Sequence, residues 1–211
     1  MSISGTVERH LEDALGEFSR GVLYTKLLEA KDYYFSRAGK ADEEDDDYES
    51  RMSHFNNWFL TQYREDGMER PMISLYVEKR KLSEEVARAL TNPVHSVYEY
   101  IGTNMRKQHV VKDIIHDEKY VFPKEDPFPS LVKNDLFLGR VLQLGESFYM
   151  MNGLCFLPKD VRSAVRKEGK RIVKLGDPGA YEEFLFKVEN LKTKWRHYGH
   201  IDPKKIFVFN S

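Results

Sequence analysis

Apolar residues in the N-terminal part of the chain recur every three or four positions, which is the period of an amphipathic helix. Residues 6–38 read as helix on this pattern, with a candidate break at Ser19-Arg20-Gly21 and a stop at Gly39. A further helical segment starts at Pro71, and another starts after Ser83, whose hydroxyl and following acids suit a helix N-terminus. Thr91-Asn92-Pro93 ends this helical region.

The helix expected over about 48–64 is rich in aromatic residues. At 100° per residue, one narrow arc of its surface holds Tyr48, Met52, Phe55 and Phe59, with Trp58 and Tyr63 at the borders. We therefore expect a core helix rather than an exposed binding surface. Gln62 falls inside the apolar arc, where its amide needs hydrogen-bond partners. The acidic run before this helix, residues 40–47, reads as a solvated connection and lacks the spacing of a calcium-binding loop.

After Pro93 the pattern changes to short runs rich in Val, Ile, Tyr and Phe, separated by turn residues. These runs predict five strands, over 94–101, 108–115, 118–122, 136–144 and 147–156. His116-Asp117 and Gly145-Glu146 are the expected hairpin turns. Short turns imply an antiparallel sheet, and five short strands would curl into a small barrel or a strongly twisted sheet.

The C-terminal part returns to helical spacing. We expect one helix over 158–168 that stops at Gly169, and a second over 178–198 that begins at Asp177-Pro178. The tail IFVFN, residues 206–210, alternates like a strand. The fold class is therefore α+β: a helical region over 1–92, a small barrel-like sheet over 93–157, and C-terminal helices with a terminal strand over 158–211, packed as one unit.

Composition narrows the class of protein. The 211 residues carry a net charge of −1, but residues 155–211 hold 13 Lys and Arg against 7 Asp and Glu, which leaves −7 for residues 1–154. Cys155 is the single cysteine, so an intramolecular disulfide and a Cys-based zinc site are excluded, and its apolar surroundings suit a buried thiol. With neither a membrane-length apolar run nor a signal-peptide pattern at the N-terminus, we expect a soluble, cytoplasmic protein and no membrane partner.

Three segments together resemble a known bacterial domain. The helix motif F-x-x-W-F-x-x-x-Y, VVKDII at 110–115 and NDLFLGRVLQL at 134–144 are similar to an uncharacterised bacterial domain often found beside a SEC-C zinc motif. The resemblance covers roughly residues 50–157 and implies an aromatic helix followed by a β-rich region. The SEC-C motif itself needs several cysteines, so no metal function carries over, and the resemblance implies no reaction.

Motifs of catalysis and cofactor binding are not found. There is no G-x-S-x-G, no phosphate loop, no dinucleotide fingerprint and no H-E-x-x-H. His197 and His200 have a ligand-like spacing, but zinc needs a further ligand from elsewhere. We therefore predict no cofactor, no metal and no catalytic residue, and incline away from an enzyme.

The best candidate site is electrostatic. Along the expected helix after Pro158, a basic strip follows one face, formed by Lys159, Arg162, Arg166 and Lys170. This strip suits an anionic partner, although any amphipathic helix needs a polar face. Arg140 is the second candidate: it lies between apolar neighbours on a strand, either facing a cleft or paired with an acid, with Asp113 and Asp135 as the expected partners.

Three functions remain open on this reasoning. The favoured one is a non-catalytic binding or regulatory module, with a groove between the helical part and the sheet that takes an unknown protein or anionic partner. The second is a nucleic-acid-associated module that uses the basic strip and the exposed aromatics Phe148, Tyr149 and Phe156, although the overall net charge gives it no support. The third is an enzyme without a readable motif.

Overall fold

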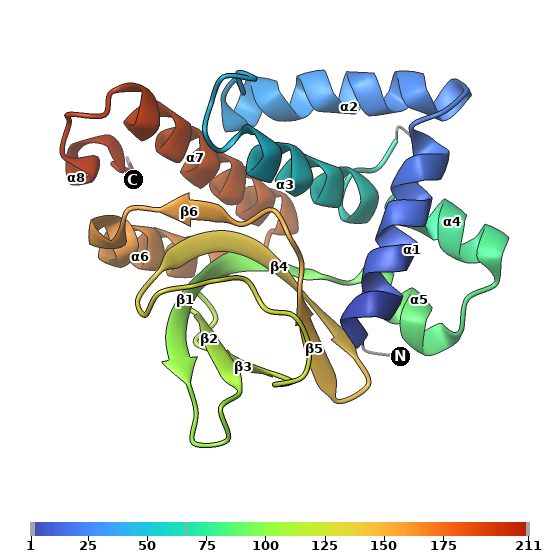
Figure 1. Cartoon of the computed structure of the whole chain (residues 1–211). Helices are drawn as coiled ribbons and strands as arrows, with labels where there is room; N and C mark the ends of the chain where they lie inside the picture. Colours follow the sequence, from blue (N-terminus) through green and yellow to red (C-terminus); the bar gives the residue numbers. More distant parts are fainter. Residues whose placement is uncertain (1–2, 66, 210–211) are drawn as a thin grey trace.

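Helices lie at both ends of the chain, and a curled antiparallel sheet lies between them, so the predicted α+β class is confirmed. The structure is a computed structural model that describes residues 3–65 and 67–209. Five helices precede the sheet: α1 (Ile3–Phe18), α2 (Val22–Ala38), α3 (Tyr48–Thr61), α4 (Ile73–Arg80) and α5 (Glu84–Thr91). Three follow it: α6 (Arg162–Val173), α7 (Pro178–His197) and the short α8 (Pro203–Ile206). In Figure 1, α2 and α3 lie above the sheet, and α4 and α5 lie to one side.

The sheet is a half-barrel with the strand order β3-β2-β1-β4-β5. Its strands are β1 (Val94–Thr103), β2 (His109–Asp113), β3 (Lys119–Phe122), β4 (Leu136–Leu144) and β5 (Ser147–Met150), and all pairs are antiparallel. The curl brings the edge strands β3 and β5 together, since the rings of Tyr120 and Phe148 lie 5.1 Å apart. Both predicted hairpin turns are present, with left-handed backbone at Asp117 (φ 62°) and Gly145 (φ 60°).

The last predicted strand, 147–156, is wrong as a continuous strand. It divides into β5 and β6 (Cys155–Leu157), which pair with different parts of β4. The segment between them passes directly against α3: a Cβ on Gly153, whose φ is 77°, would lie 2.5 Å from the backbone nitrogen of His54. The chain therefore leaves the sheet where the helix approaches, and only glycine fits there.

The aromatic helix is a core element, as predicted. Phe55 and Phe59 are 1% and 0% exposed; Phe55 packs on Tyr34 and Phe35 of α2, and Phe59 packs on Phe18 of α1. Trp58 is also buried, and its ring lies 5.7 Å from that of Phe186 in α7. The buried surface of α3 is wider than the predicted arc because α3 lies between α2 and the sheet (Figure 1), while Tyr48 and Met52 are only partly buried.

Two predictions for the C-terminal part are wrong. Gly169 does not stop a helix, because α6 continues to Val173. A Cβ on Gly169 would lie 2.8 Å from the side chain of Ile115, so glycine lets α6 pack closely on the sheet. The tail does not form a strand over its described residues: residues 203–206 are helical, and the irregular chain after them buries Phe207 against the α6–α7 layer. Asn210, the last predicted strand residue, lies outside the described residues.

The acidic run before α3 has a structural role beyond that of a solvated connection. Asp47 forms ion pairs with Lys192 and Arg196 of α7, the second at 3.1 Å. Asp45 lies 3.8 Å from the guanidinium of the buried Arg51. The acidic residues at the end of the α2–α3 loop therefore bind this loop to the last turns of α7.

Candidate functional site

A buried arginine lies at the junction of the sheet and α3. Arg140 of β4 is 1% exposed and is paired in register with His95 of β1. Its Nε donates to Oε1 of Gln62 at 2.8 Å, and Nη1 lies 3.3 Å from both Nε2 and the carbonyl oxygen of His54. Nη2 lies 3.4 Å from Nδ1 of His95. Every acceptor around this guanidinium is an uncharged group.

The hydrogen bonds fix the proton positions on both imidazoles. Nδ1 of His54 lies 2.7 Å from the carbonyl oxygen of Gly153, so it carries the proton and Nε2 accepts from Arg140. Nδ1 of His95 accepts from Arg140, so the proton of that ring is on Nε2. This Nε2 is buried and has no hydrogen-bond partner among the described residues. A buried donor without an acceptor costs free energy, so an acceptor beside His95 would stabilise the site.

Arg140 alone carries charge in this cluster. Burial, together with the nearby guanidinium, lowers the pKa of His54 and of His95 well below the ordinary value, so both are neutral. Burial also lowers the pKa of Arg140 to about 10, which leaves it protonated at neutral pH. No carboxylate in the described ranges, 3–65 and 67–209, forms an ion pair with it. Glu189 and Glu182 act on it electrostatically and raise its pKa against the effect of burial, but neither is bound to it, and a buried charge without a directly bound counter-charge is costly.

The expected acidic partners of Arg140 are engaged elsewhere, so that prediction is wrong. Asp113 is fully buried in the β2–β3 turn, where it accepts from the backbone nitrogens of Ile115 and His116 at 2.8 and 3.0 Å. Asp135 accepts from the backbone nitrogen of Val132 and pairs with Lys159 at 3.1 Å. Both acids stabilise turns near their own positions. The sequence around Arg140 does not show that these two carboxylates have other partners.

A polar face of α3 holds His54 in place. Ser50 Oγ donates to the carbonyl oxygen of Leu154, and Asn57 Nδ2 donates to that of Asn152, each at 2.8 Å. With His54 bound to Gly153, side chains at positions 50, 54 and 57 therefore bind three successive carbonyls of the segment between β5 and β6. Positions 50, 54 and 57 are four and three residues apart, so they lie on one face of α3. His54 is not among the site residues predicted from the sequence, although this polar spacing in the sequence points to it.

A surface pocket of about 490 Å³ lies in front of this cluster. Four parts of the chain line it: the end of α3, the α5–β1 junction, the β2–β3 turn and the first turns of α7. In that order, the lining residues are Thr61, Gln62 and Arg64; residues 91–95; His116; and Pro178, Gly179, Tyr181, Glu182 and Leu185. Gln62 and His95 are the lining residues that contact Arg140, so the buried charge lies directly behind the pocket wall.

The rest of the pocket wall is also mainly electropositive. Asp113 accepts from Nδ1 of His116 at 2.8 Å, and this hydrogen bond raises the pKa of that imidazole. The N-terminus of α7 opens on the pocket at Pro178 and Gly179, but the carboxylate of Asp177 already caps it by accepting from the backbone nitrogen of Gly179 at 2.8 Å. Arg64 adds a full positive charge. Glu182 is the one acid in the lining, and its Oε1 accepts from Nε1 of Trp58 at 2.9 Å.

The predicted basic strip is paired with acids of the chain's own sheet. Arg162 makes two hydrogen bonds to the carboxylate of Glu99, at 2.8 and 2.9 Å. Arg166 and Lys170 both bind Asp117 of the β2–β3 turn, and Lys159 pairs with Asp135. The strip and Arg140 do not form one site, because the cations of the strip bind Glu99, Asp117 and Asp135, whereas Arg140 contacts Gln62, His54 and His95.

The three aromatic residues suggested for base stacking do not share an exposed face. Tyr149 is 4% exposed and donates its hydroxyl to Glu8 at 2.8 Å. Phe148 packs within the half-barrel, and Phe156 alone is largely exposed, at 45%. Cys155 is buried, which raises the pKa of its thiol well above the ordinary value and favours the unreactive protonated form.

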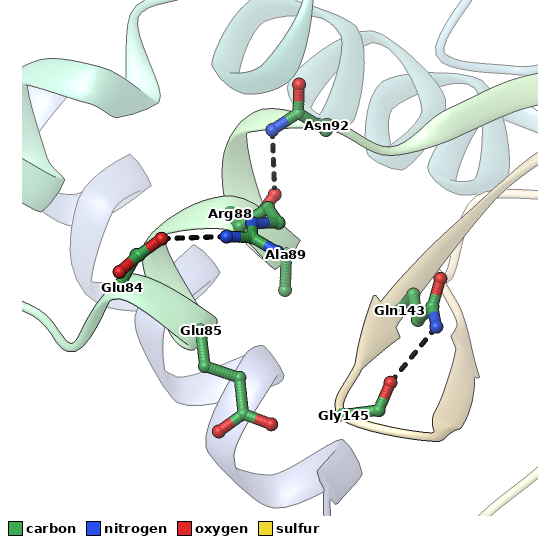
Figure 2. Close-up of a pocket in the computed structure, with 7 residues that line it drawn as sticks. All are labelled: Glu84, Glu85, Arg88, Ala89, Asn92, Gln143 and Gly145. Atoms are coloured by element: carbon green, nitrogen blue, oxygen red, sulfur yellow. Dashed lines mark hydrogen bonds and ion pairs between the residues drawn. The ribbon is translucent and has the colours of Figure 1, made fainter.

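A second hollow, of about 550 Å³, lies between α5 and the β4–β5 turn. Figure 2 shows that several of its polar groups are already paired: Arg88 with Glu84, and the amide of Gln143 with the carbonyl oxygen of Gly145. Glu85 points into the hollow from an exposed position. Among the residues that the structure describes, no buried side-chain atom without a hydrogen-bond partner belongs to the lining of this hollow, so the pocket in front of Arg140 is the stronger candidate.

Comparisons with protein-family models, with curated proteins and with solved structures gave no match for this chain. Across residues 3–65 and 67–209, none of the helices has the length and apolar character needed to cross a membrane. The site is therefore interpreted from its own geometry.

Proposed function

We propose that the protein is a non-catalytic binding module that takes a small anionic ligand, a carboxylate or a phosphate, in the pocket in front of Arg140. The observation that carries this proposal is the environment of Arg140: a buried guanidinium whose hydrogen-bond partners are Gln62, His54 and His95, all uncharged. An anion in the pocket would supply the counter-charge, and electrostatic attraction is strong where water is excluded.

The donors around the pocket support an anion rather than a cation. The proton on Nε2 of His95 has no acceptor among the described residues, and His116 has a raised pKa that favours its charged form. Arg64 adds a full positive charge to the lining. Glu182 is the one negative group of the lining, and its hydrogen bond from Trp58 fixes the position of its carboxylate.

The hydroxyl groups of the pocket favour binding over catalysis. Thr61 donates to the carbonyl oxygen of Asn57 at 2.6 Å, and Thr91 donates to that of Ala87 at 2.8 Å, so both serve their own helices. The hydroxyl of Tyr181 lies 2.9 Å from that of Ser96. A nucleophile needs an adjacent general base, and these hydrogen bonds provide none.

A titration of the imidazole signals by NMR tests the proposal. Inorganic phosphate and succinate are added separately to the protein, and the ring signals of all histidines are followed. We expect saturable shifts at His95 and His116, with a higher pKa of His116 in the bound state because a bound anion favours the imidazolium. Shifts that grow linearly, or that are equal at the remote His197, would overturn the proposal.

The wider setting of this module rests on the sequence. We propose that it is a soluble, cytoplasmic protein, which its charge-rich composition supports. The similarity of residues 50–157 to the bacterial domain found beside SEC-C motifs likewise stays a proposal, supported by the short motifs alone.

A further inference from the structure

A basic groove lies between α6 and the C-terminal tail. Helix α6 and residues 207–209 of the tail enclose a hollow of about 770 Å³. Six cations line it, against one acid, Glu168: Arg162, Arg166, Lys167, Lys170, Arg171 and Lys174. This groove is separate from the pocket in front of Arg140 and shares no lining residue with it.

The cations of the groove fall into two groups. The arginines and Lys170 are held in place by acids, which are Glu99 and Asp117 from the sheet and Glu168 from α6 itself. Lys167 and Lys174 are exposed and form no ion pair with any residue in the described ranges. The groove therefore presents two free ammonium groups on a scaffold of fixed side chains.

The tail gives the groove an apolar wall. Phe207 is 2% exposed and anchors the tail in the core, which leaves Val208 beside the groove with 53% of its surface exposed. Phe209 is partly buried, and the ammonium of Lys187 lies 5.4 Å from its ring centre. An aliphatic side chain beside free lysines suits a ligand that is both apolar and acidic.

We propose that this groove docks an acidic peptide segment of a partner protein, with an apolar side chain against Val208 and carboxylates on Lys167 and Lys174. Charge complementarity selects the acidic partner. A peptide fits better than a nucleic acid because Glu99, Asp117 and Glu168 pair with four of the six cations, which leaves two separate ammonium groups rather than a continuous row of positive charge for phosphates. Val208 offers no ring on which a base could stack, and the ring of Phe209 is partly buried with the ammonium of Lys187 5.4 Å from its centre.

Fluorescence anisotropy tests the docking directly. The probe is a labelled peptide of eight acidic residues around one central leucine, titrated with the full chain. We expect saturable binding that weakens by about tenfold or more in the variant Lys167→Glu/Lys174→Glu, because two attractive contacts become repulsive. The matched control is Lys204→Glu/Lys205→Glu, which makes the same charge change on exposed lysines of α8, outside the groove. We expect the control to bind within about twofold of the wild type.

Three results would overturn the inference. The first is no saturable binding by the wild-type protein, and the second is an equal loss in the groove variant and the α8 control, which would indicate unspecific attraction. The third is tighter binding of a single-stranded DNA oligonucleotide that is lost in the groove variant alone, which would assign the groove to nucleic acid. Peptide binding by the Gln62→Glu variant, whose change lies in the other pocket, separates this outcome from that of the anion proposal.

Discussion

Gln62 accepts a hydrogen bond from Nε of Arg140 at 2.8 Å, which connects the end of α3 to the middle of β4 across 78 positions of the chain. Each of these residues is anomalous in its own segment: an amide within an aromatic helix arc, and a cation among apolar strand residues. Together they explain one another, because the amide gives the buried guanidinium an acceptor and the guanidinium gives the amide a donor.

Loss of the Gln62 amide should destabilise the fold. In Gln62→Ala the Nε of Arg140 loses its acceptor, and a buried charged donor without a partner costs about 1–3 kcal/mol. Chemical denaturation measures this loss in the free energy of unfolding. The control is Gln143→Ala, which removes an exposed amide from β4, the strand of Arg140. Its free energy of unfolding should stay within about 0.5 kcal/mol of that of the wild type. Equal stability of the two variants would contradict the role given to Gln62.

The aromatic helix makes a larger contribution to stability. Phe55 and Phe59 are 1% and 0% exposed, so we expect Phe55→Ala or Phe59→Ala to cost about 3–5 kcal/mol, the usual effect of removing a buried phenyl ring. Phe156→Ala provides the comparison, since that side chain is 45% exposed. Denaturation curves that show a loss below about 1 kcal/mol at both buried positions would mean that the helix does not form the core.

Glu189 should make stability depend on pH. Burial raises the pKa of this carboxyl to about 7, against the lowering effect of the hydrogen bond from Tyr34 and of Arg51 and Arg140. Between the ordinary value of 4.5 and about 7, the folded protein therefore binds more protons than the unfolded chain. Stability falls as pH rises through this window and is level above it.

The variant Glu189→Gln tests this pH dependence. This variant lacks the titrating group. The free energy of unfolding of Glu189→Gln minus that of the wild type should therefore increase by roughly 3 kcal/mol between pH 4.5 and pH 7, at about 1.4 kcal/mol per unit of pKa shift. Urea denaturation at several pH values provides the measurement. Parallel pH profiles of the two proteins would show that Glu189 has an ordinary pKa in the fold.

Asp117 should have the opposite dependence on pH. Hydrogen bonds from Lys170, Lys112 and Arg166 hold the pKa of its carboxyl well below the ordinary value of 3.8. The stabilisation is therefore present above the ordinary value and is lost as pH falls below it. Asp117→Asn, which tolerates the left-handed backbone at this position, should lower the denaturation midpoint at pH 6 and have a smaller effect below about pH 3. High salt should also reduce the difference. A difference that persists at low pH would show that the carboxylate charge is not its cause.

The sequence predicted most elements, because the signals for them are local. Ser83 accepts from the backbone nitrogen of Val86 at the start of α5, and Asp177 accepts from that of Gly179 at the start of α7, as their positions before helical runs indicate. The failures are tertiary. The sequence predicts a helix stop at Gly169, but the glycine is there because the side chain of Ile115 leaves no room for a Cβ. The last strand divides near Gly153 because α3 approaches the chain there.

The candidate site was predictable in part. Arg140 and Gln62 stand out because each breaks an apolar pattern, whereas His95 joins them only through the register of β1 on β4. Arg162, Arg166 and Lys170 of the predicted basic strip lie on α6, but the acids that pair with them, Glu99 and Asp117, come from distant parts of the chain. Such pairing depends on the packed fold, which helical spacing alone does not specify.

The central claim is that Arg140, a buried guanidinium with no directly bound carboxylate, selects an anion, and an isosteric charge change tests it most directly. Gln62→Glu keeps an acceptor for Nε of Arg140 and places a built-in carboxylate at the site, while Gln143→Glu makes the same change outside the pocket. Calorimetric titration with phosphate and with succinate measures the affinity of each protein.

The account predicts saturable binding by the wild type and by Gln143→Glu, and a loss of about tenfold or more in a folded Gln62→Glu protein, whose own carboxylate takes the place of the ligand. Binding that is unchanged in Gln62→Glu, or absent from the wild type for both anions, would contradict it.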